Sequence, residues 1–419
     1  MKGIICFVSL SLLSIQSFSQ KKCETAVYFN NEINKNIDFR NQYRAIEEFT
    51  NHYVNNSNNN SNQFRLNGAT VIKIPVVVHV LYHFPDQKIS DEIIRNQIKI
   101  LNRDFRRRNA DTALTPLTFR NIATDCEIEF QLATSDPRQF STTGIIKKYT
   151  PVNTWESDDK MKFDSEMGSD AWDSKKYLNI WVCSMGGLAG YSTLPGGDPK
   201  KDGVVVDFGS FNANLSGSDY NMGRTAVHEV GHWLNLKHIW GDSDCGDDGV
   251  SDTPKQEIYT VGCPTGVRIS CNNGAAGNMY MNYMDFTNDA CMNMFSNGQK
   301  TRMRSLFSAG GVRESMLSST GLSVPLVIIT PIELPDPTWL FAKIYPNPVT
   351  DKLKFNLEYD SRWIGKNINV MNLSGQVIKI IKIPSKDFEV DLSALPGGVY
   401  FLTAKKEDGD FIRHKFIKI

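Results

Sequence analysis

The chain has 419 residues, of which 41% are hydrophobic and 22% are charged, and its 46 basic residues balance 46 acidic ones. A chain of this length usually divides into two or three domains, and this composition is typical of a soluble globular protein. The balanced charge argues against a nucleic-acid binder, which usually carries a basic excess.

Residues 1–19 predict a signal peptide. Lys2 supplies the positive start, residues 4–15 form the apolar stretch, and Ser17 and Ser19 are small residues at the positions that a signal peptidase reads. A short buried helix is the alternative interpretation. The stretch is too short for a permanent membrane span, and no later segment is long and apolar enough for one. We therefore expect an exported protein, in which disulfides are permitted.

Residues 20–67 are polar and end in the low-complexity run "NNSNNNSNQ". Such a run cannot bury apolar surface, so we expect a solvated connector, and Arg65 just beyond it is open to proteolysis. The region resembles a propeptide with a cleavable, Asn-rich hinge.

From residue 68 to residue 318 the apolar pattern alternates between strands and helices. Ser90 is a good N-cap for a helix in which Ile94, Ile98 and Leu101 recur at helical spacing. Between the last two predicted helices the chain is rich in Gly, Asn, Asp and Cys. The sequence predicts strands at 71–83, 127–133, 177–183 and 203–208, and further helices at 221–235 and 297–309.

The remaining chain divides into a linker and a β-rich region. Six prolines lie between residues 325 and 348, and this density predicts a stiff linker, which we place at 319–343. Residues 344–419 then contain apolar runs such as "KLKFNLEY" and "GVYFLTAKK", with turn signals roughly every 8–12 residues. This spacing predicts a small all-β sandwich.

The segment "HEVGHWLNLKH" (228–238) contains three of the 7 histidines of the chain. His228 and His232 lie one helical turn apart on one face, so both can bind one ion, and Glu229 beside them can take a proton from a water that the metal activates. A straight helix would carry His238 too far away, because ten residues span about 15 Å. The helix must therefore end near Asn235, where the chain turns back.

Asn235 stands where this turn needs a positive φ, which glycine adopts without strain and asparagine tolerates better than other residues with a side chain. We expect a cost of about 1 kcal/mol relative to glycine. Unrelated core or surface histidines are one alternative to a metal site. A structural zinc site is another, but it would need four protein ligands, whereas three histidines leave one position open for water, as catalytic sites do.

These residues resemble the metzincin zinc endopeptidases, whose pattern is H-E-x-x-H-x-x-G-x-x-H followed by a methionine turn. The segment matches at every position except the glycine, which is Asn235, and "MNYMDF" (281–286) fits the methionine turn. "HIWGD" after the third histidine, four clustered cysteines and "NYMD" resemble the pappalysin family, in its cytophagalysin branch, over residues 70–310. The resemblance implies an α+β catalytic domain with a mixed twisted sheet and an active-site helix.

The resemblance also implies roles for single residues. Met284 would lie beneath the metal, although plain core packing is the alternative for this residue. Phe286 stands where many members carry a tyrosine that stabilises the tetrahedral oxyanion, so that hydroxyl is missing here. Zinc would be bound by His228, His232 and His238, and Glu229 would polarise the attacking water.

The acidic loop 241–256 and the cysteines around it are further features that the resemblance interprets. Carboxylates at this density suit calcium, and a solvated acidic loop is the alternative. Four cysteines allow three pairings, and the sequence alone does not choose among them. The resemblance implies the pairs Cys245–Cys271 and Cys263–Cys291. It implies calcium near this loop, with Asp247, Asp248, Asp252 and Thr253 as the candidate ligands.

Cys23 in "KKCET" has two interpretations. A thiolate binds zinc strongly, so a propeptide cysteine can occupy the open fourth position and exclude water; the segment resembles a cysteine switch of this kind. An unpaired or structural cysteine is the other interpretation.

Residues 344–419 resemble the type A C-terminal sorting domain of the type IX secretion system. The resemblance is carried by "IYPNPVTDKLKF", "NLSGQVI", "DLSALPGGVYFLTAKK" and the final "KFIKI", in this order. It implies contact with the secretion machinery, export through the periplasm, and a secreted or cell-surface protein. A carbohydrate- or protein-binding module is the alternative.

The sequence therefore predicts a secreted zinc endopeptidase of proteins or peptides, made as a latent precursor. One alternative is a non-catalytic surface adhesin on a protease scaffold. The other is a zinc hydrolase of small peptides, because the sequence shows neither a closed pocket nor an extended cleft.

Overall fold

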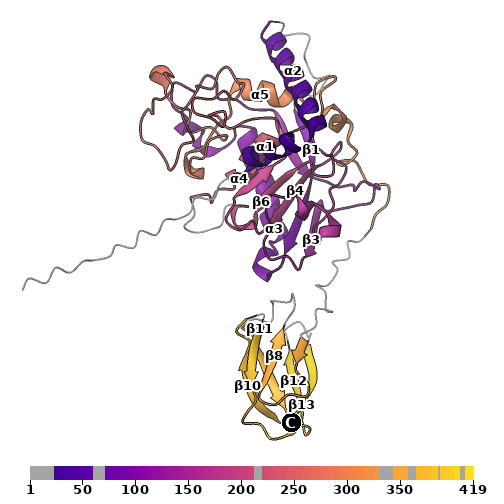
Figure 1. Cartoon of the computed structure of the whole chain (residues 1–419). Helices are drawn as coiled ribbons and strands as arrows, with labels where there is room; N and C mark the ends of the chain where they lie inside the picture. The colour runs from indigo at the N-terminus through magenta and orange to yellow at the C-terminus, as the bar shows by residue number, and fades with distance from the viewer. Residues whose placement is uncertain are drawn as a thin grey trace, which may run out of the picture.

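The computed structural model describes residues 23–59, 71–211, 219–329, 343–356, 365–385, 387–405 and 411–419. They form a larger part built around a mixed sheet, which we call the catalytic part after the sequence prediction, and a separate C-terminal β-sandwich (Figure 1). The predicted signal peptide, the end of the Asn-rich hinge and most of the Pro-rich linker lie outside the described residues. None of the helices in the described ranges combines the length and hydrophobicity that a membrane span needs.

The catalytic part contains a six-stranded sheet. Five of its strands follow the order β2-β1-β4-β6-β5, and the sixth, β3, pairs with β1. All pairs are parallel except β5 with β6, so the sheet is mixed, as predicted. The strands are β1 (Ile72–Tyr82), β2 (Ile128–Leu132), β3 (Ile145–Tyr149), β4 (Leu178–Cys183), β5 (Gly190–Ser192) and β6 (Val204–Asp207). The sequence predicted four of them and missed β3 and β5.

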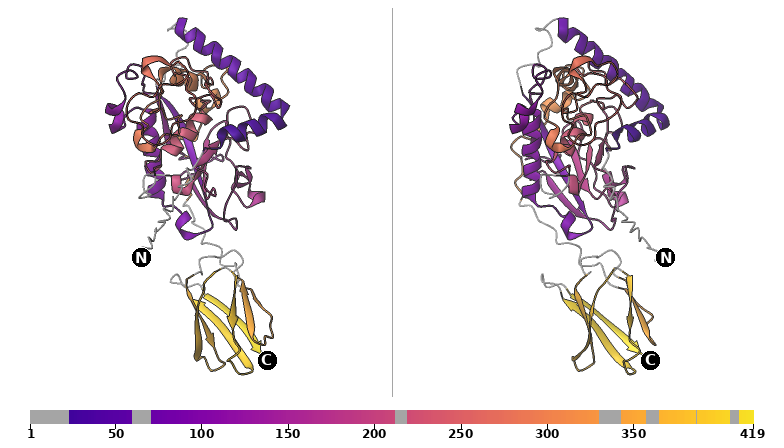
Figure 2. Two further views of the ribbon diagram at one scale, coloured as in Figure 1. Left: turned by 60° about the vertical axis from the view of Figure 1, so that its left-hand side comes forward. Right: turned by 90° about the vertical axis from the view of Figure 1, so that its left-hand side faces the viewer.

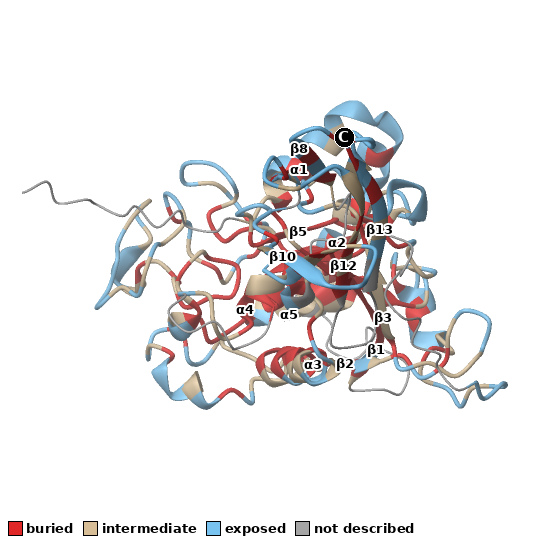
Figure 3. Cartoon of the chain, turned by 90° about the horizontal axis from the view of Figure 1, so that it is seen from below, coloured by how far each residue is buried: buried red, intermediate tan, exposed pale blue. Residues whose placement is uncertain are grey.

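The apolar runs of β1, β4 and β6 are buried because helices cover the sheet. Helix α3 (Asp91–Phe105) begins at Ser90, whose side chain accepts a hydrogen bond from the Ile93 amide, and it packs on β2 and α4. Helix α4 (Arg224–Trp233) is buried along its whole length. Figure 3 shows buried segments concentrated around the sheet and these helices.

Shorter helices complete the catalytic part. Helix α5 (Asn297–Ser305) begins with a capping box formed by Ser296 and Gln299. The single-turn 3-10 helices are Pro85–Gln87, Ala110–Leu114, Lys160–Lys162, Asp164–Glu166, Phe208–Ser210, Gly274–Ala276, Asp289–Cys291 and Glu314–Ser318.

The propeptide region is more ordered than its polar composition predicted. It forms α1 (Thr25–Lys35) and α2 (Ile37–Asn59), and α2 continues through the first residues of the Asn-rich run. The expectation of a connector was wrong for the first residues of the run "NNSNNNSNQ", because α2 continues to Asn59. Tyr28, Phe39 and Tyr53 are buried and hold the two helices to the catalytic part. Helix α1 packs beside β5 and α2 lies along α5 (Figure 2).

The first residues of the predicted linker also contact the catalytic part. The Thr134 amide donates to the Gly321 carbonyl over 2.9 Å, and the Ser141 amide donates to the Val327 carbonyl over 2.8 Å. In the structure, residues 321–327 are therefore attached to the catalytic part by backbone hydrogen bonds rather than forming a free spacer.

The C-terminal part is a sandwich of a four-stranded sheet, β10-β9-β12-β13, and a three-stranded sheet, β11-β8-β7. Its core includes Leu353, Val370, Leu402 and Phe416. The strands are β7 (Lys343–Tyr345), β8 (Lys352–Asn356), β9 (Asn367–Met371), β10 (Val377–Lys382), β11 (Asp387–Asp391), β12 (Gly398–Lys405) and β13 (Phe411–Lys418). All of them except β7 fall on predicted strand runs.

Candidate metal centre and cleft

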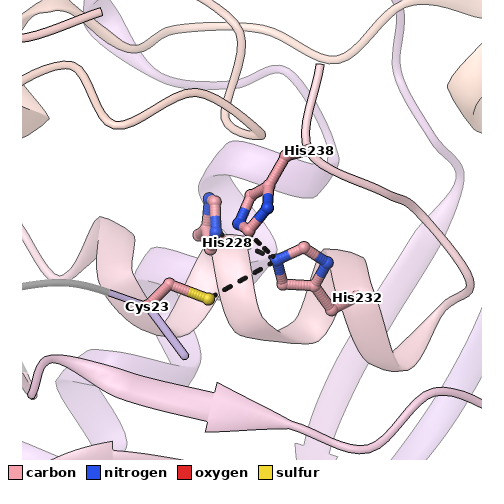
Figure 4. A group of neighbouring side chains, drawn as sticks. All are labelled: Cys23, His228, His232 and His238. Atoms are coloured by element: carbon pink, nitrogen blue, oxygen red, sulfur yellow. Dashed lines mark hydrogen bonds between the residues drawn. The ribbon is translucent and has the colours of Figure 1, made fainter. Parts of the chain in front are cut away.

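Three imidazoles meet at the end of α4. His228 and His232 project from the helix, and His238 returns from the following loop, so that His232 Nε2 lies 3.1 Å from the Nε2 atoms of both His228 and His238 (Figure 4). All three side chains are buried. The sequence spacing predicted this convergence, including the break in the helix that it requires.

The hydrogen bonds of the opposite ring nitrogens define what these rings can bind. Nδ1 of His228 donates to the Tyr283 carbonyl over 2.7 Å, and Nδ1 of His232 donates to the Leu236 carbonyl over 2.8 Å. Nδ1 of His238 lies 2.5 Å from an Asp242 carboxylate oxygen. With Nδ1 protonated, each Nε2 carries a lone pair, and three lone pairs converge in a buried space. A cation satisfies this arrangement, and three nitrogen ligands suit zinc.

Burial also keeps the rings in the form that binds metal. It lowers the pKa of His228 to about 3, with a further contribution from His238, and it lowers the pKa of His232 well below the usual range. Both rings are therefore neutral near pH 7 and available as ligands.

Asn235 makes the turn that returns His238. Its φ is +70°, the left-handed conformation that the sequence predicted. Its carbonyl accepts a 2.7 Å hydrogen bond from Nε of the buried Arg302, and its side-chain Nδ2 donates to Glu47 of α2 over 2.8 Å. The side chain of Asn235 thus contacts the propeptide region. A glycine at this position has no side chain and could not make this contact.

Glu229 lies beside the three histidines and is fully buried. Its Oε2 accepts a hydrogen bond from Oγ1 of Thr25 over 2.9 Å, whereas Oε1 has no hydrogen-bond partner. Burial raises the pKa of this carboxyl to about 8, although contacts with Cys23 and Thr25 lower it. A carboxyl whose pKa lies near neutrality can both accept and return a proton.

Cys23 lies at the same point as the histidines. Its Sγ is 3.6 Å from Nε2 of His232, and the sulfur and the three ring nitrogens all lie within 4.8 Å of one another. Figure 4 shows the thiol directed into the centre of this group. Cys23 and the residue after it lie along β5, where the Glu24 amide donates to the Gly190 carbonyl over 3.1 Å.

Met284 supports the helix that carries the first two histidines. It is fully buried, and a side-chain carbon placed on Gly231 of α4 would lie only 2.5 Å from its sulfur. The Met284 carbonyl accepts from the Ile239 amide, next to His238, over 3.2 Å. The turn therefore contacts the backbone on both sides of the metal centre.

Phe286 packs among aromatic rings instead of offering a hydroxyl. Its ring centroid lies 4.9 Å from those of His238 and Trp240. Tyr283 does not replace the missing phenol, because its ring is buried against Phe295. Tyr220, which the sequence analysis missed, donates from its hydroxyl to the Phe286 carbonyl over 3.2 Å.

A pocket opens beside His228 and Glu229, with Tyr220 on its wall. Asp289 also lines it; one of its carboxylate oxygens accepts from the Met222 amide over 2.8 Å, and the other has no hydrogen-bond partner. Burial raises the pKa of Asp289 to about 6. Neither Asp289 nor Asp242 was among the predicted site residues, although Asp242 follows His238 at helical spacing.

The acidic loop separates its four candidate ligands. Asp248 and Thr253 meet, since the Thr253 hydroxyl lies 2.9 Å from both carboxylate oxygens of Asp248. Asp252 instead accepts from the Ser296 hydroxyl and the Gly298 amide at the start of α5. Asp247 is exposed and lies near Lys255. The structure thus brings two of the four candidates together.

Two disulfides brace this loop-rich region. They join Cys245 to Cys271 and Cys263 to Cys291, which are the pairs that the resemblance implies. Cys126 and Cys183 are buried free thiols in the catalytic part.

Comparisons with known proteins agree with this geometry. The family described as pregnancy-associated plasma protein-A, a peptidase family, matches residues 161–308, and the secretion system C-terminal sorting domain matches residues 343–419. An extracellular metalloprotease of Arthroderma gypseum is 31% identical over 258 residues, which cover 58% of this chain and 76% of the relative.

Two solved structures are more similar. Mature mirolysin of Tannerella forsythia, in complex with a cleaved peptide, is 48% identical, covers 59% of this chain and 96% of its own, and has a TM-score of 0.58. A promirolysin mutant of the same organism is 45% identical, covers 64% of this chain and 91% of its own, and has a TM-score of 0.59.

Proposed function

Because this chain belongs to the pappalysin family of zinc metalloendopeptidases and ends in a secretion-system sorting domain, we propose that it is a secreted endopeptidase, made as a latent precursor, in which His228, His232 and His238 bind the catalytic zinc. The observation that carries the proposal is the convergence of three unprotonated Nε2 atoms, of which that of His232 lies 3.1 Å from each of the other two. The adhesin alternative loses its support, because the family is one of active peptidases.

Glu229 performs the proton transfers in this proposal. Zinc, when bound, supplies a Lewis acid that activates water and the scissile carbonyl. Glu229 accepts the proton that the attacking water loses and returns it to the leaving amine. The free Oε1 of Glu229, which lies beside the three histidines, supports this role. The hydrogen bonds from Nδ1 of the histidines hold the rings in the orientation for metal binding.

Latency follows from the place of the propeptide segment. Cys23 lies where a fourth ligand would approach the three histidines. The Thr25 hydroxyl donates a hydrogen bond to the carboxylate of Glu229. The same segment covers the free edge of β5. Substrate therefore cannot reach the metal centre, the base or the edge strand until this segment leaves. An edge strand beside the base supports cleavage of extended chains rather than of small peptides alone.

Calcium is a second cofactor in this proposal, at Asp248 and Thr253. The carboxylate of Asp248 is buried, and burial raises its pKa to about 7. A cation at this point would offset the cost of burying the charge. Asp252 belongs to the cap of α5 instead.

The C-terminal sandwich is proposed to engage the type IX secretion machinery and so to deliver the protease to the cell surface or medium. The sorting-domain match over residues 343–419 supports this role. Transfer of the sandwich to an unrelated periplasmic protein should be sufficient for secretion.

Chelation tests the enzymatic proposal. The activated protein should cleave casein, lose that activity with a strong zinc chelator, and regain it when about one equivalent of zinc is returned. Cleavage that continues unchanged after complete removal of zinc would exclude the proposed chemistry.

A further inference from the structure

Strand β5 is the edge of the sheet nearest to the metal centre. Its partner within the sheet is β6, and its other side is covered by the propeptide segment. The Glu24 amide donates to the Gly190 carbonyl, and the Ser192 amide donates to Thr25 Oγ1 over 2.8 Å. Once this segment leaves, an extended peptide can therefore form hydrogen bonds with the same backbone amide and carbonyl groups of β5.

A side-chain pocket adjoins this edge, and Tyr28 of α1 fills it. The Tyr28 ring lies 5.0 Å from that of Tyr191, the central residue of β5. The Tyr28 hydroxyl donates to Oδ2 of Asp159 over 2.8 Å, and the side chain is only 7% exposed. The other oxygen of Asp159 accepts from the Tyr191 hydroxyl over 2.9 Å.

The catalytic part holds this pocket in place without help from the propeptide. Lys162, which is fully buried, lies 2.8 Å from Oδ1 of Asp159, and Lys201 lies 3.2 Å from Oδ2. Lys162 also donates to the Lys201 carbonyl over 2.8 Å. The acceptor that Tyr28 uses is thus fixed by residues that remain after activation.

The charge of the pocket changes when the propeptide leaves. Glu32, one turn after Tyr28 on the same face of α1, pairs with Lys201 over 3.2 Å. Its departure leaves the ammonium groups of Lys162 and Lys201 beside the carboxylate of Asp159. A cationic side chain would meet these two ammonium groups there, whereas a phenol would meet an acceptor and an aromatic wall.

From these contacts we infer that the pocket formed by Asp159, Lys162, Tyr191 and Lys201 is a substrate subsite that takes a tyrosine side chain. The inference rests on the proposed function, because the propeptide must leave β5 for substrate to bind there. Tyrosine is preferred to phenylalanine because its hydroxyl reaches Asp159, and to arginine because of the two lysines. In the precursor, Tyr28 occupies the subsite.

The test is cleavage of a peptide series by the protein matured from its full-length precursor. One cleavable parent peptide carries Tyr, Phe, Ala or Arg at each position in turn on both sides of the scissile bond, and kcat/KM is measured for every member. At one position we expect Tyr to exceed Phe by about tenfold or more, and to exceed Arg by at least as much. At every other position we expect kcat/KM for the Tyr peptide to exceed that for the Phe peptide by at most about twofold.

Two variants assign the preference to this pocket. Asp159→Asn should bring the Tyr-to-Phe ratio at that position close to one. If this variant does not fold, Lys201→Ala serves instead and should raise the relative kcat/KM of the Arg peptide at the same position. The subsite is excluded if the wild type cleaves the series with no position preferring Tyr, or if neither variant moves the preference. A wild type that cleaves no member overturns the proposed function, and this inference with it.

Discussion

The side-chain amide of Asn235 donates a 2.8 Å hydrogen bond to Glu47, so the residue that turns the chain toward His238 also contacts helix α2 of the propeptide. Glu47 pairs in addition with Arg302, whose Nε donates to the Asn235 carbonyl. One carboxylate of the propeptide is thus bonded to the turn that positions His238, a proposed zinc ligand. The asparagine that departs from the family pattern is explained by both roles.

Asn235→Gly should loosen the propeptide without harming the turn, because glycine adopts the same positive φ. Labelling of the Cys23 thiol in the full-length precursor measures how often the segment opens. We expect Asn235→Gly and Glu47→Gln each to speed labelling by about five- to tenfold, as loss of a charged hydrogen bond does.

The double variant of the same precursor should label no faster than the faster single variant, because both changes remove one contact. Cys23→Ala is the background control and should not be labelled, because the other free thiols, Cys126 and Cys183, are buried. Additive effects of the two substitutions would show that the residues act independently and would contradict the contact.

The same contact predicts a pH dependence. Burial alone would raise the pKa of Glu47, but Arg302 and Lys237 hold it below its ordinary value of 4.5. Because the docked pKa is depressed, the contribution to docking is present above pH 4.5 and is lost as pH falls through the docked pKa. Hydrogen exchange of α2, corrected for intrinsic rates, should separate wild type from Glu47→Gln at pH 6, and the two rates should converge once pH falls below the depressed docked pKa. A constant difference over this range would refute the assignment.

Removal of the Cys23 thiol tests the cause of latency. Cys23→Ala should allow the uncleaved precursor to hydrolyse casein at a measurable rate, although below that of the mature protein because Thr25 still contacts Glu229. Cys126→Ala is the matched control and should remain latent. A Cys23→Ala precursor as silent as the wild type would mean that α1 and α2 block the cleft without the thiol.

Calcium binding is tested by two neighbouring aspartates. Added calcium should raise the melting temperature of the zinc-loaded wild type by several degrees and should not change that of Asp248→Asn. Asp247→Asn, whose carboxylate is exposed, should respond as the wild type does. If the two variants respond alike, Asp248 is not a ligand.

Much of the site was readable from the sequence because helical geometry links spacing to direction. The interval from His228 to His232 placed two proposed ligands on one helix face, and the interval to His238 required the turn at Asn235. The strands of the core followed from continuous apolar runs. Strand β5 did not, because three residues carry no pattern, although it forms the edge that the propeptide covers.

The propeptide was misjudged for a related reason. Its apolar residues are few, and only contact with the catalytic part makes Tyr28, Phe39 and Tyr53 a buried face. The partners of Glu47 and Tyr28 lie more than a hundred residues away in the chain. Such long-range polar pairs leave no local signature, so the second contact of Asn235 could be seen only in the folded chain.

Glu229→Ala is the most direct test of the central claim. The variant precursor is processed with an added protease and compared with the matured wild type for zinc content, thermal stability and casein hydrolysis. We expect about one equivalent of zinc and an unchanged fold, with hydrolysis reduced at least about a hundredfold, the usual contribution of a general base. Hydrolysis at the wild-type rate by a zinc-loaded Glu229→Ala protein would contradict the account.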